Sequence, residues 1–171
     1  MISNFINNYL HYCFLIIGIL WIPAVLLLWD KYAKDKRKAF MNFLNGKEYI
    51  MLENLKYIPK EGRKTDFIIC DLIFYKDQIF MLDTLTYFWG KLKIRSQITH
   101  FYPNLIDPNI SRFAFVSYEI VKVVPGGKHF FVIFKSPQII FKDSINQFQF
   151  ILKEEDIPIV HKIFENSNWP E

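Results

Sequence analysis

A long apolar run without charged residues lies near the N-terminus and constrains the fold more than any other feature. From Tyr9 to Trp29 the sequence contains no Asp, Glu, Lys or Arg. As an α-helix this run would be about 31 Å long, which matches the hydrocarbon thickness of a bilayer. Tyr9, Tyr12 and Trp29 stand at its two ends, as aromatic residues do at membrane interfaces. The run therefore predicts a transmembrane helix.

Two other interpretations of the run are a buried helix of a globular domain and a cleaved signal peptide. A buried helix needs a core that covers all its faces, which the remaining stretch of about 120 residues does not supply. A signal peptide needs a basic start and small residues at a cleavage site. Residues 1–8 contain no Lys or Arg, and Leu28-Trp29-Asp30 ends the run. A transmembrane helix is therefore favoured over both.

Basic residues follow the run and are missing before it. The positive-inside rule then predicts a single-pass membrane protein with its N-terminus outside and its C-terminal domain cytoplasmic, in a bacterial inner membrane or an organelle equivalent. We expect an extracytoplasmic tail (1–8), a transmembrane helix (9–29) and a basic amphipathic juxtamembrane helix (30–47) that ends near Gly46. This last helix would lie against lipid headgroups or form a plain stalk packed on the following domain. The membrane-flanking cations are Lys31, Lys34, Lys36, Arg37 and Lys38.

Two residues inside the run are candidate contacts for a partner helix. Pro23 removes a backbone donor, which favours a kink, and Gly18 leaves space for a neighbouring helix to approach. The alternative is ordinary tolerance, because Gly and Pro are frequent in membrane spans.

From residue 48 the pattern changes to short alternating apolar runs separated by turns, which is typical of β-strands. Lys76-Asp77 joins two such runs as a tight hairpin. The last segment returns to helical spacing. We therefore predict an α+β membrane protein whose domain (48–171) is an antiparallel β-sandwich or open barrel of seven to eight strands closed by a C-terminal helix. The expected strands are 48–57, 66–75, 78–88, 92–101, 112–124, 128–134, 138–142 and 147–152.

Three stretches of this domain resemble a pleckstrin-homology or GRAM-type domain. They read DLIFYKDQIFML, FVSYEIVKVV and KHFFVIFKSPQIIFKDSINQFQFIL, the last followed by the predicted helix. The resemblance covers about residues 48–168 and includes the small bacterial domains of this type that are fused to membrane helices. Trp169 is similar to the family's Trp near the end of the closing helix. The resemblance implies a binding module, since the family has no invariant catalytic residue.

The clearest polar feature of the domain is a set of alternating cations. Lys91, Lys93 and Arg95 would lie on one face of a strand, and Arg63 and Lys64 come from a basic loop. They are candidates for binding anionic lipid or phosphate, although a solvated strand face explains the same pattern.

Aromatic residues form a second candidate contact surface. Tyr87, Phe88 and Trp89 are consecutive, and strand side chains alternate between two faces, so they cannot all enter one core. At least one of them is expected on the surface or under a partner.

No catalytic or metal-binding motif is evident. The four histidines and two cysteines have no metal-ligand spacing, and no phosphate-binding or nucleophile motif occurs. The net charge of +4 is concentrated beside the apolar run, which argues against nucleic acid.

We therefore predict a non-enzymatic, membrane-anchored binding or scaffold module without cofactors, which contacts protein or anionic lipid. The alternative is an accessory structural subunit of a larger membrane complex, docked through its helix and aromatic surface. The sequence leaves the oligomeric state open.

Overall fold

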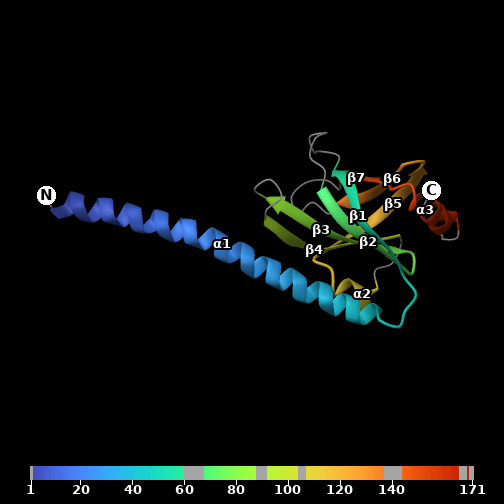
Figure 1. The fold of residues 1–171 in the computed structure, drawn as a ribbon, viewed down its shortest axis with the longest axis horizontal. Coiled ribbons are helices and arrows are strands. Elements are labelled where there is room, and N and C mark those ends of the chain that lie inside the picture. Colours follow the sequence, from blue (N-terminus) through green and yellow to red (C-terminus); the bar gives the residue numbers. More distant parts are fainter. Residues whose placement is uncertain are drawn as a thin grey trace.

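The computed structural model places a long helix against a seven-stranded closed barrel (Figure 1). It describes residues 2–59, 68–87, 92–103, 107–136, 144–165 and 169. The elements are α1 (Ile2–Leu44), β1 (Ile50–Pro59), β2 (Ile68–Tyr75), β3 (Gln78–Tyr87), β4 (Leu92–Tyr102), α2 (Pro108–Ser111), β5 (Val116–Gly126), β6 (His129–Ser136), β7 (Ser144–Ile151) and α3 (Ile157–Glu165).

The sheet is mixed, which corrects the prediction of an antiparallel sandwich or open barrel. Neighbouring strands are antiparallel except β4 and β5, which pair in parallel over Thr99–Tyr102 and Val116–Glu119. The connection that contains α2 returns the chain, so β5 runs in the direction of β4. Pairing of β1 with β7 closes the barrel. The predicted strand at 138–142 lies outside the described residues.

The predicted hairpin at Lys76-Asp77 is confirmed. Tyr75 pairs with Gln78, which leaves a two-residue turn between β2 and β3. Both turn residues have positive φ, at 49° and 55°, as a turn that follows the right-handed twist of the strands requires.

The barrel interior is filled by alternate residues of the strands and is rich in aromatic rings. Phe130 of β6 and Phe150 of β7 stack with their centroids 4.8 Å apart. One mouth of the barrel is covered by α3, whose Val160 and Ile163 are buried in this interior cluster. The period of two in the strands and the stripe on the last helix therefore produce one core.

A second apolar cluster lies outside the barrel, between its wall and the C-terminal part of α1. Phe40 and Leu44 of α1 are fully buried against the outward-facing side chains of β2, β3 and β4. The second half of β2 and the first half of β3 are consequently buried on both faces, which explains the continuous apolar runs LIFY and IFML. The wall residues of this cluster are Ile73, Tyr75, Phe80, Leu82 and Ile98.

Polar side chains of α1 bind backbone groups of β4 and of β3, where the register of these two strands shifts between Leu82 and Thr84. The Asp30 carboxylate accepts a hydrogen bond from the Arg95 main-chain N–H at 2.8 Å. The Arg37 guanidinium donates to the main-chain oxygens of Asp83 and Ser96. Backbone groups at such a shift need these partners when water is excluded from them.

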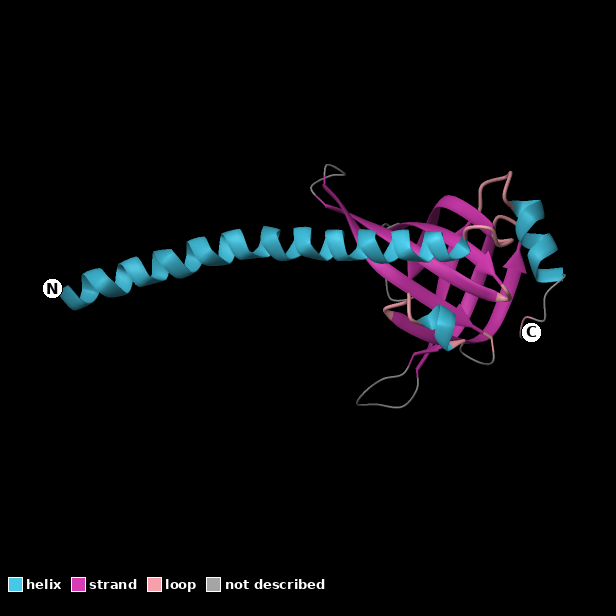
Figure 2. Ribbon diagram, turned by 90° about the horizontal axis from the view of Figure 1, so that it is seen from below, coloured by secondary structure: helices cyan, strands magenta, loops and turns pink. Residues whose placement is uncertain are grey.

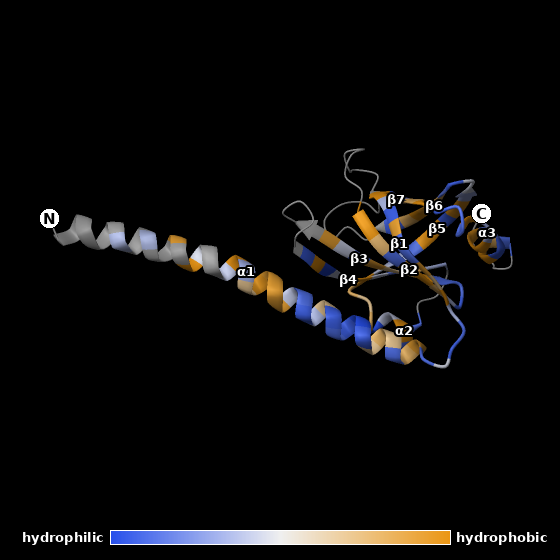
Figure 3. Cartoon of the chain, viewed as in Figure 1, coloured by the Kyte–Doolittle hydropathy of each residue, from blue (hydrophilic) through white to orange (hydrophobic). Residues whose placement is uncertain are grey.

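The helix α1 continues without interruption through the predicted membrane span and the predicted juxtamembrane segment. Its docked part (Trp29–Leu44) lies along the barrel, and its projecting part (Ile2–Leu28) extends beyond it (Figure 2). Figure 3 shows hydrophilic residues in blue along the middle of the docked part, with hydrophobic residues in orange directly before them and at the C-terminal end of α1.

The predicted transmembrane helix at Tyr9–Trp29 is contradicted. Across the described residues, no helix combines the length and hydropathy that crossing a bilayer requires. The expected continuation of the helix through the basic segment is present, since α1 has 43 residues and ends at Leu44. The single-pass location, with an outer N-terminus and a cytoplasmic domain, falls with the predicted span. The basic segment packs on the barrel through Phe40 and Leu44.

Candidate functional site

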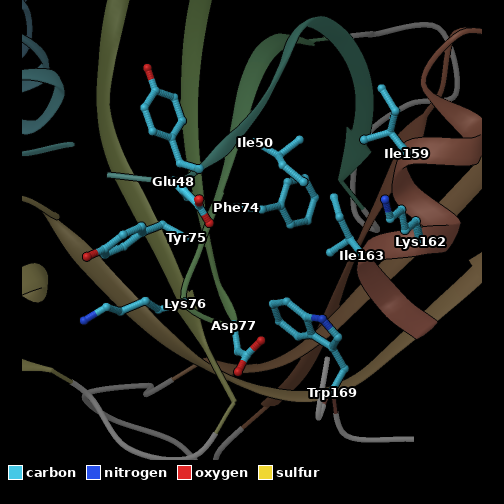
Figure 4. A pocket seen from close by; sticks show the side chains of 11 residues that line it. Glu48, Ile50, Phe74, Tyr75, Lys76, Asp77, Ile159, Lys162, Ile163 and Trp169 are labelled. Carbon is cyan, nitrogen blue, oxygen red and sulfur yellow. The ribbon is translucent and has the colours of Figure 1, made fainter. Parts of the chain in front are cut away.

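A groove of about 520 Å³ lies between α3, the start of β1 and the β2–β3 hairpin (Figure 4). We call it the α3–β1 groove. Its floor and walls are mainly apolar, and four charged side chains stand around it. The lining residues are Glu48, Tyr49, Ile50, Phe74, Tyr75, Lys76, Asp77, Ile159, Lys162, Ile163 and Trp169.

The groove exists because α3 covers the barrel mouth unevenly. Among the strands, α3 lies closest to β5, and its buried face points inward through Val160 and Ile163. Ile159, on the side of the helix that faces β1, is 39% exposed. The hairpin after β2 and the segment before β1 form the opposite wall, so the floor between them stays open.

The edge of β1 beside this groove has a strand neighbour on one side. Ile50 pairs with Phe74 of β2, but β7 joins β1 only from Lys56, opposite Ile151. A bulge follows at Asn54, which has φ of 55° and donates its main-chain N–H to the Asp71 carboxylate at 2.9 Å. Several backbone groups of β1 therefore face the groove side without a strand partner among the described residues.

Trp169 closes one end of the groove with its ring. Its ring packs edge-on against Phe164 with centroids 5.7 Å apart. Its Nε1 atom is buried and has no hydrogen-bond partner among the described residues. In Figure 4 the ring lies opposite Asp77, at the end of the groove away from Ile159. A buried N–H of this kind costs free energy until an acceptor reaches it.

Aromatic, aliphatic and charged side chains set the chemical character of the α3–β1 groove. Its described lining contains no Ser, Thr, Cys or His. It combines aromatic and aliphatic surface with charges of both signs at the rim, as protein-recognition surfaces do. In the described residues, no group of three or more His, Cys, Asp or Glu is placed to hold a metal ion.

The basic residues predicted to bind anions are brought together in part. Lys93 and Arg95 line a hollow of about 280 Å³ together with Arg37 of α1. Asp71 also lines this hollow, and Arg95 forms an ion pair with Asp30 at 3.3 Å, so much of the positive charge is balanced. Arg63, Lys64 and Lys91 lie outside the described residues.

The membrane-flanking cations occupy both sides of the docked part. Arg37 is partly buried against the barrel, where burial lowers its pKa. Lys36 is also partly covered, whereas Lys31, Lys34 and Lys38 are exposed.

Of the predicted partner contacts, the structure describes the surroundings of Gly18 and Pro23. Gly18 and Pro23 are exposed on the projecting part of α1, and no atom of the described structure lies within 4 Å of a Cβ built on Gly18. Tyr87 ends β3, and its side chain is not among those described; Phe88 and Trp89 lie outside the described residues.

One histidine has an environment that the sequence did not indicate. His100 is fully buried; Ser117 Oγ lies 3.1 Å from its Nδ1, and Gln78 Oε1 lies 2.8 Å from its Nε2. Its ring stacks on Phe80, and burial lowers its pKa to about 4. A hydrolytic triad would need a carboxylate behind the imidazole and access to the Ser. Here neutral Gln replaces the acid, so the chain Gln78–His100–Ser117 ties β3, β4 and β5 together.

A second polar group that sequence reasoning missed is Asp83, inside the barrel. The Tyr57 hydroxyl donates to its carboxylate at 3.2 Å, and burial raises the pKa of Asp83 to about 6. Burial likewise raises the pKa of the neighbouring Cys70 thiol, which makes it a poor nucleophile. Asp83 lies at an inward-facing position of the alternating pattern in β3. The pattern therefore places a polar side chain in the barrel, but it does not identify Tyr57 as its partner.

Comparisons with known proteins identify no family for this chain. No family model matches the chain, and no curated protein or solved structure is significantly similar to it.

Proposed function

We propose that this chain is a non-enzymatic protein-binding module whose recognition site is the α3–β1 groove. The observation that carries the proposal is the groove itself: an open hollow of about 520 Å³ with an apolar floor and a rim of both charges. Such a combination suits a few apolar side chains of a partner, with flanking residues that match the rim.

The side chains of the groove support a protein partner over a small polar substrate. Phe74 and Ile163 form a buried floor, and exposed Ile50 and Ile159 extend the apolar surface outward. An apolar floor that opens to the surface can receive anchor residues from another chain while the rim stays in contact with water. The pleckstrin-homology resemblance, which stays a prediction, supports the same class of function.

The proposal can be tested with peptides selected from a random library against the full chain. Ile159→Glu places a charge on the groove wall at a partly exposed helix position, so the fold should tolerate it. We expect this variant to bind selected peptides at least about tenfold more weakly, which is typical of a lost anchor contact.

The matched control is Ile145→Glu, because Ile145 is 57% exposed on β7 and does not line the groove. It should bind like the unmodified chain. Failure to select any peptide, or equal affinities for all three proteins, would contradict a recognition site in the groove.

A second candidate function, an accessory subunit of a larger protein assembly, is favoured by the projecting part of α1. Trp21, Leu27 and Leu28 are 67%, 66% and 66% exposed there, and Ile22 is 63% exposed. A contiguous apolar surface of this kind usually marks an interaction site. The partner that fits it is an apolar helix of another subunit.

Site-specific crosslinking in cells tests this second function. A photo-reactive residue in place of Trp21 should crosslink to one partner in stoichiometric amount. The same residue in place of Lys34, exposed on the docked part, should not. Crosslinks from both positions to many chains would rule out a defined assembly.

A further inference from the structure

The start of β1 has no strand partner on its second side among the described residues, and this edge indicates how a partner would enter the α3–β1 groove. We infer that the partner binds as an extended strand that pairs with β1 beside Ile50, Met51 and Leu52, an inference that rests on the proposed function. Its main chain would extend the sheet, and alternate side chains would enter the groove.

The backbone of β1 is available at these residues because β7 departs early. The register of β1 with β7 begins at Lys56 and runs away from the groove. Beyond β7, the Leu152 main-chain N–H donates to the Lys128 carbonyl at 2.9 Å, which directs the chain toward the β5–β6 turn. The position that a continuing β7 would occupy is thus left to another strand.

The length of the open edge is limited at its far end. Lys153 Nζ donates to the main-chain oxygen of Glu53 at 2.7 Å, and the bulge at Asn54 follows. Between this contact and Glu48 there is room for a strand of about four residues. In a closed barrel an exposed edge of this kind is an exception, since closure normally satisfies every strand.

The groove also supplies what an entering strand needs. Exposed Ile50 and Ile159 offer apolar surface to the alternate side chains of such a strand. Lys162 stands on the α3 wall, whereas Glu48, Lys76 and Asp77 stand on the opposite wall. Lys76 is occupied there, since its Nζ lies over the Tyr75 ring. The occupant that fits is therefore an extended segment of a protein with alternating apolar residues, an acidic residue toward Lys162 and a basic residue toward Glu48 and Asp77.

Two measurements with the selected peptides test this inference on the full chain. Saturating peptide should slow amide hydrogen exchange by at least about tenfold at residues of the open β1 edge. N-methylation of single peptide residues should weaken binding at alternate positions and leave the intervening positions unchanged, because a strand directs successive N–H groups to opposite sides.

The two proposals fail in different ways. A peptide whose binding is lost in Ile159→Glu, but which neither protects the β1 amides nor shows the alternation, would overturn strand addition and leave the groove as a binding site. A helical peptide or a second copy of this chain in the groove would give that result. If no peptide is selected, or if Ile159→Glu binds unchanged, both proposals fail.

Discussion

The two parts of α1 are continuous in the backbone and opposite in their surroundings. In the docked part, Ala33, Phe40 and Leu44 have no exposed surface, whereas in the projecting part Trp21 and Leu28 are 67% and 66% exposed. The more apolar part of the helix is thus the more exposed one. Burial here follows from a stripe that matches a surface on the barrel, and average hydropathy does not predict it.

The largest expected effect compares two truncations of the chain. Removing residues 1–28 takes away the projecting part and should leave unfolding in urea nearly unchanged, because that part adds little to either apolar cluster. Removing residues 1–47 uncovers the outer wall of the barrel. We expect it to lower the free energy of unfolding by more than about 5 kcal/mol, since three fully buried side chains, Ala33, Phe40 and Leu44, are lost together.

Circular dichroism during urea titration measures both effects. The prediction that residues 48–171 form the domain implies the opposite outcome, in which the shorter chain is as stable as the longer one. That outcome would show that the outer cluster contributes little and would remove the contrast between the two parts of α1.

Single substitutions should reproduce the contrast on a smaller scale. Phe40→Ala is expected to cost about 3 to 5 kcal/mol, because Phe40 fills the space between Phe80 and Phe113. Leu28→Ala in the projecting part should change stability by less than about 0.5 kcal/mol. Equal costs, measured from urea midpoints, would mean that the projecting part is also packed in solution.

The docking of α1 could have been predicted in part from the sequence. Ala33, Arg37, Phe40 and Leu44 recur at the spacing of one helix face, and the basic segment was recognised as amphipathic. What the stripe covers depends on the outward faces of β2, β3 and β4. Those strands lie next to each other only after the barrel closes, so a local pattern could not name the partner surface.

The groove was less accessible to sequence reasoning. Its open edge depends on where β7 stops relative to β1, a register between residues far apart in the chain. Its wall depends on the position of α3 over the barrel mouth. Trp169 was noticed through the family resemblance, but nothing in the sequence placed its ring opposite Asp77.

The docked part also brings a cation near a buried acid, and this gives a pH prediction of intermediate size. The pKa of Asp83 is about 6 in the folded chain, against an ordinary value of 3.8. As the pH rises, the unfolded chain therefore loses the carboxyl proton of Asp83 before the folded chain does. The contribution of Asp83 to stability is therefore highest below pH 3.8 and falls as the pH rises through 6. Asp83→Asn should remove this loss and still accept the Tyr57 hydrogen bond.

We expect Asp83→Asn to stabilise the chain by about 2 kcal/mol at pH 8 and by close to nothing at pH 3.5. Urea midpoints of the two proteins at both pH values give the comparison. His100 does not disturb it, because its lowered pKa affects both proteins equally. A gain of the same size at both pH values would show that the effect comes from packing and not from the charge of Asp83.

The smallest expected effect separates charge from backbone capping at the start of the docked part. The hydrogen bond from the Arg95 main chain is the first cause of the lowered pKa of Asp30, ahead of its attraction to the Arg95 side chain. Asp30→Asn keeps an acceptor for that N–H, and the partly exposed ion pair that it removes should be worth less than about 1 kcal/mol. Asp30→Ala leaves the Arg95 main-chain N–H without the acceptor and should cost more than Asp30→Asn. If the two variants are equally stable in low and high salt, the docked part is held by its apolar stripe alone, and Asp30 does not contribute to the difference between the two parts of α1.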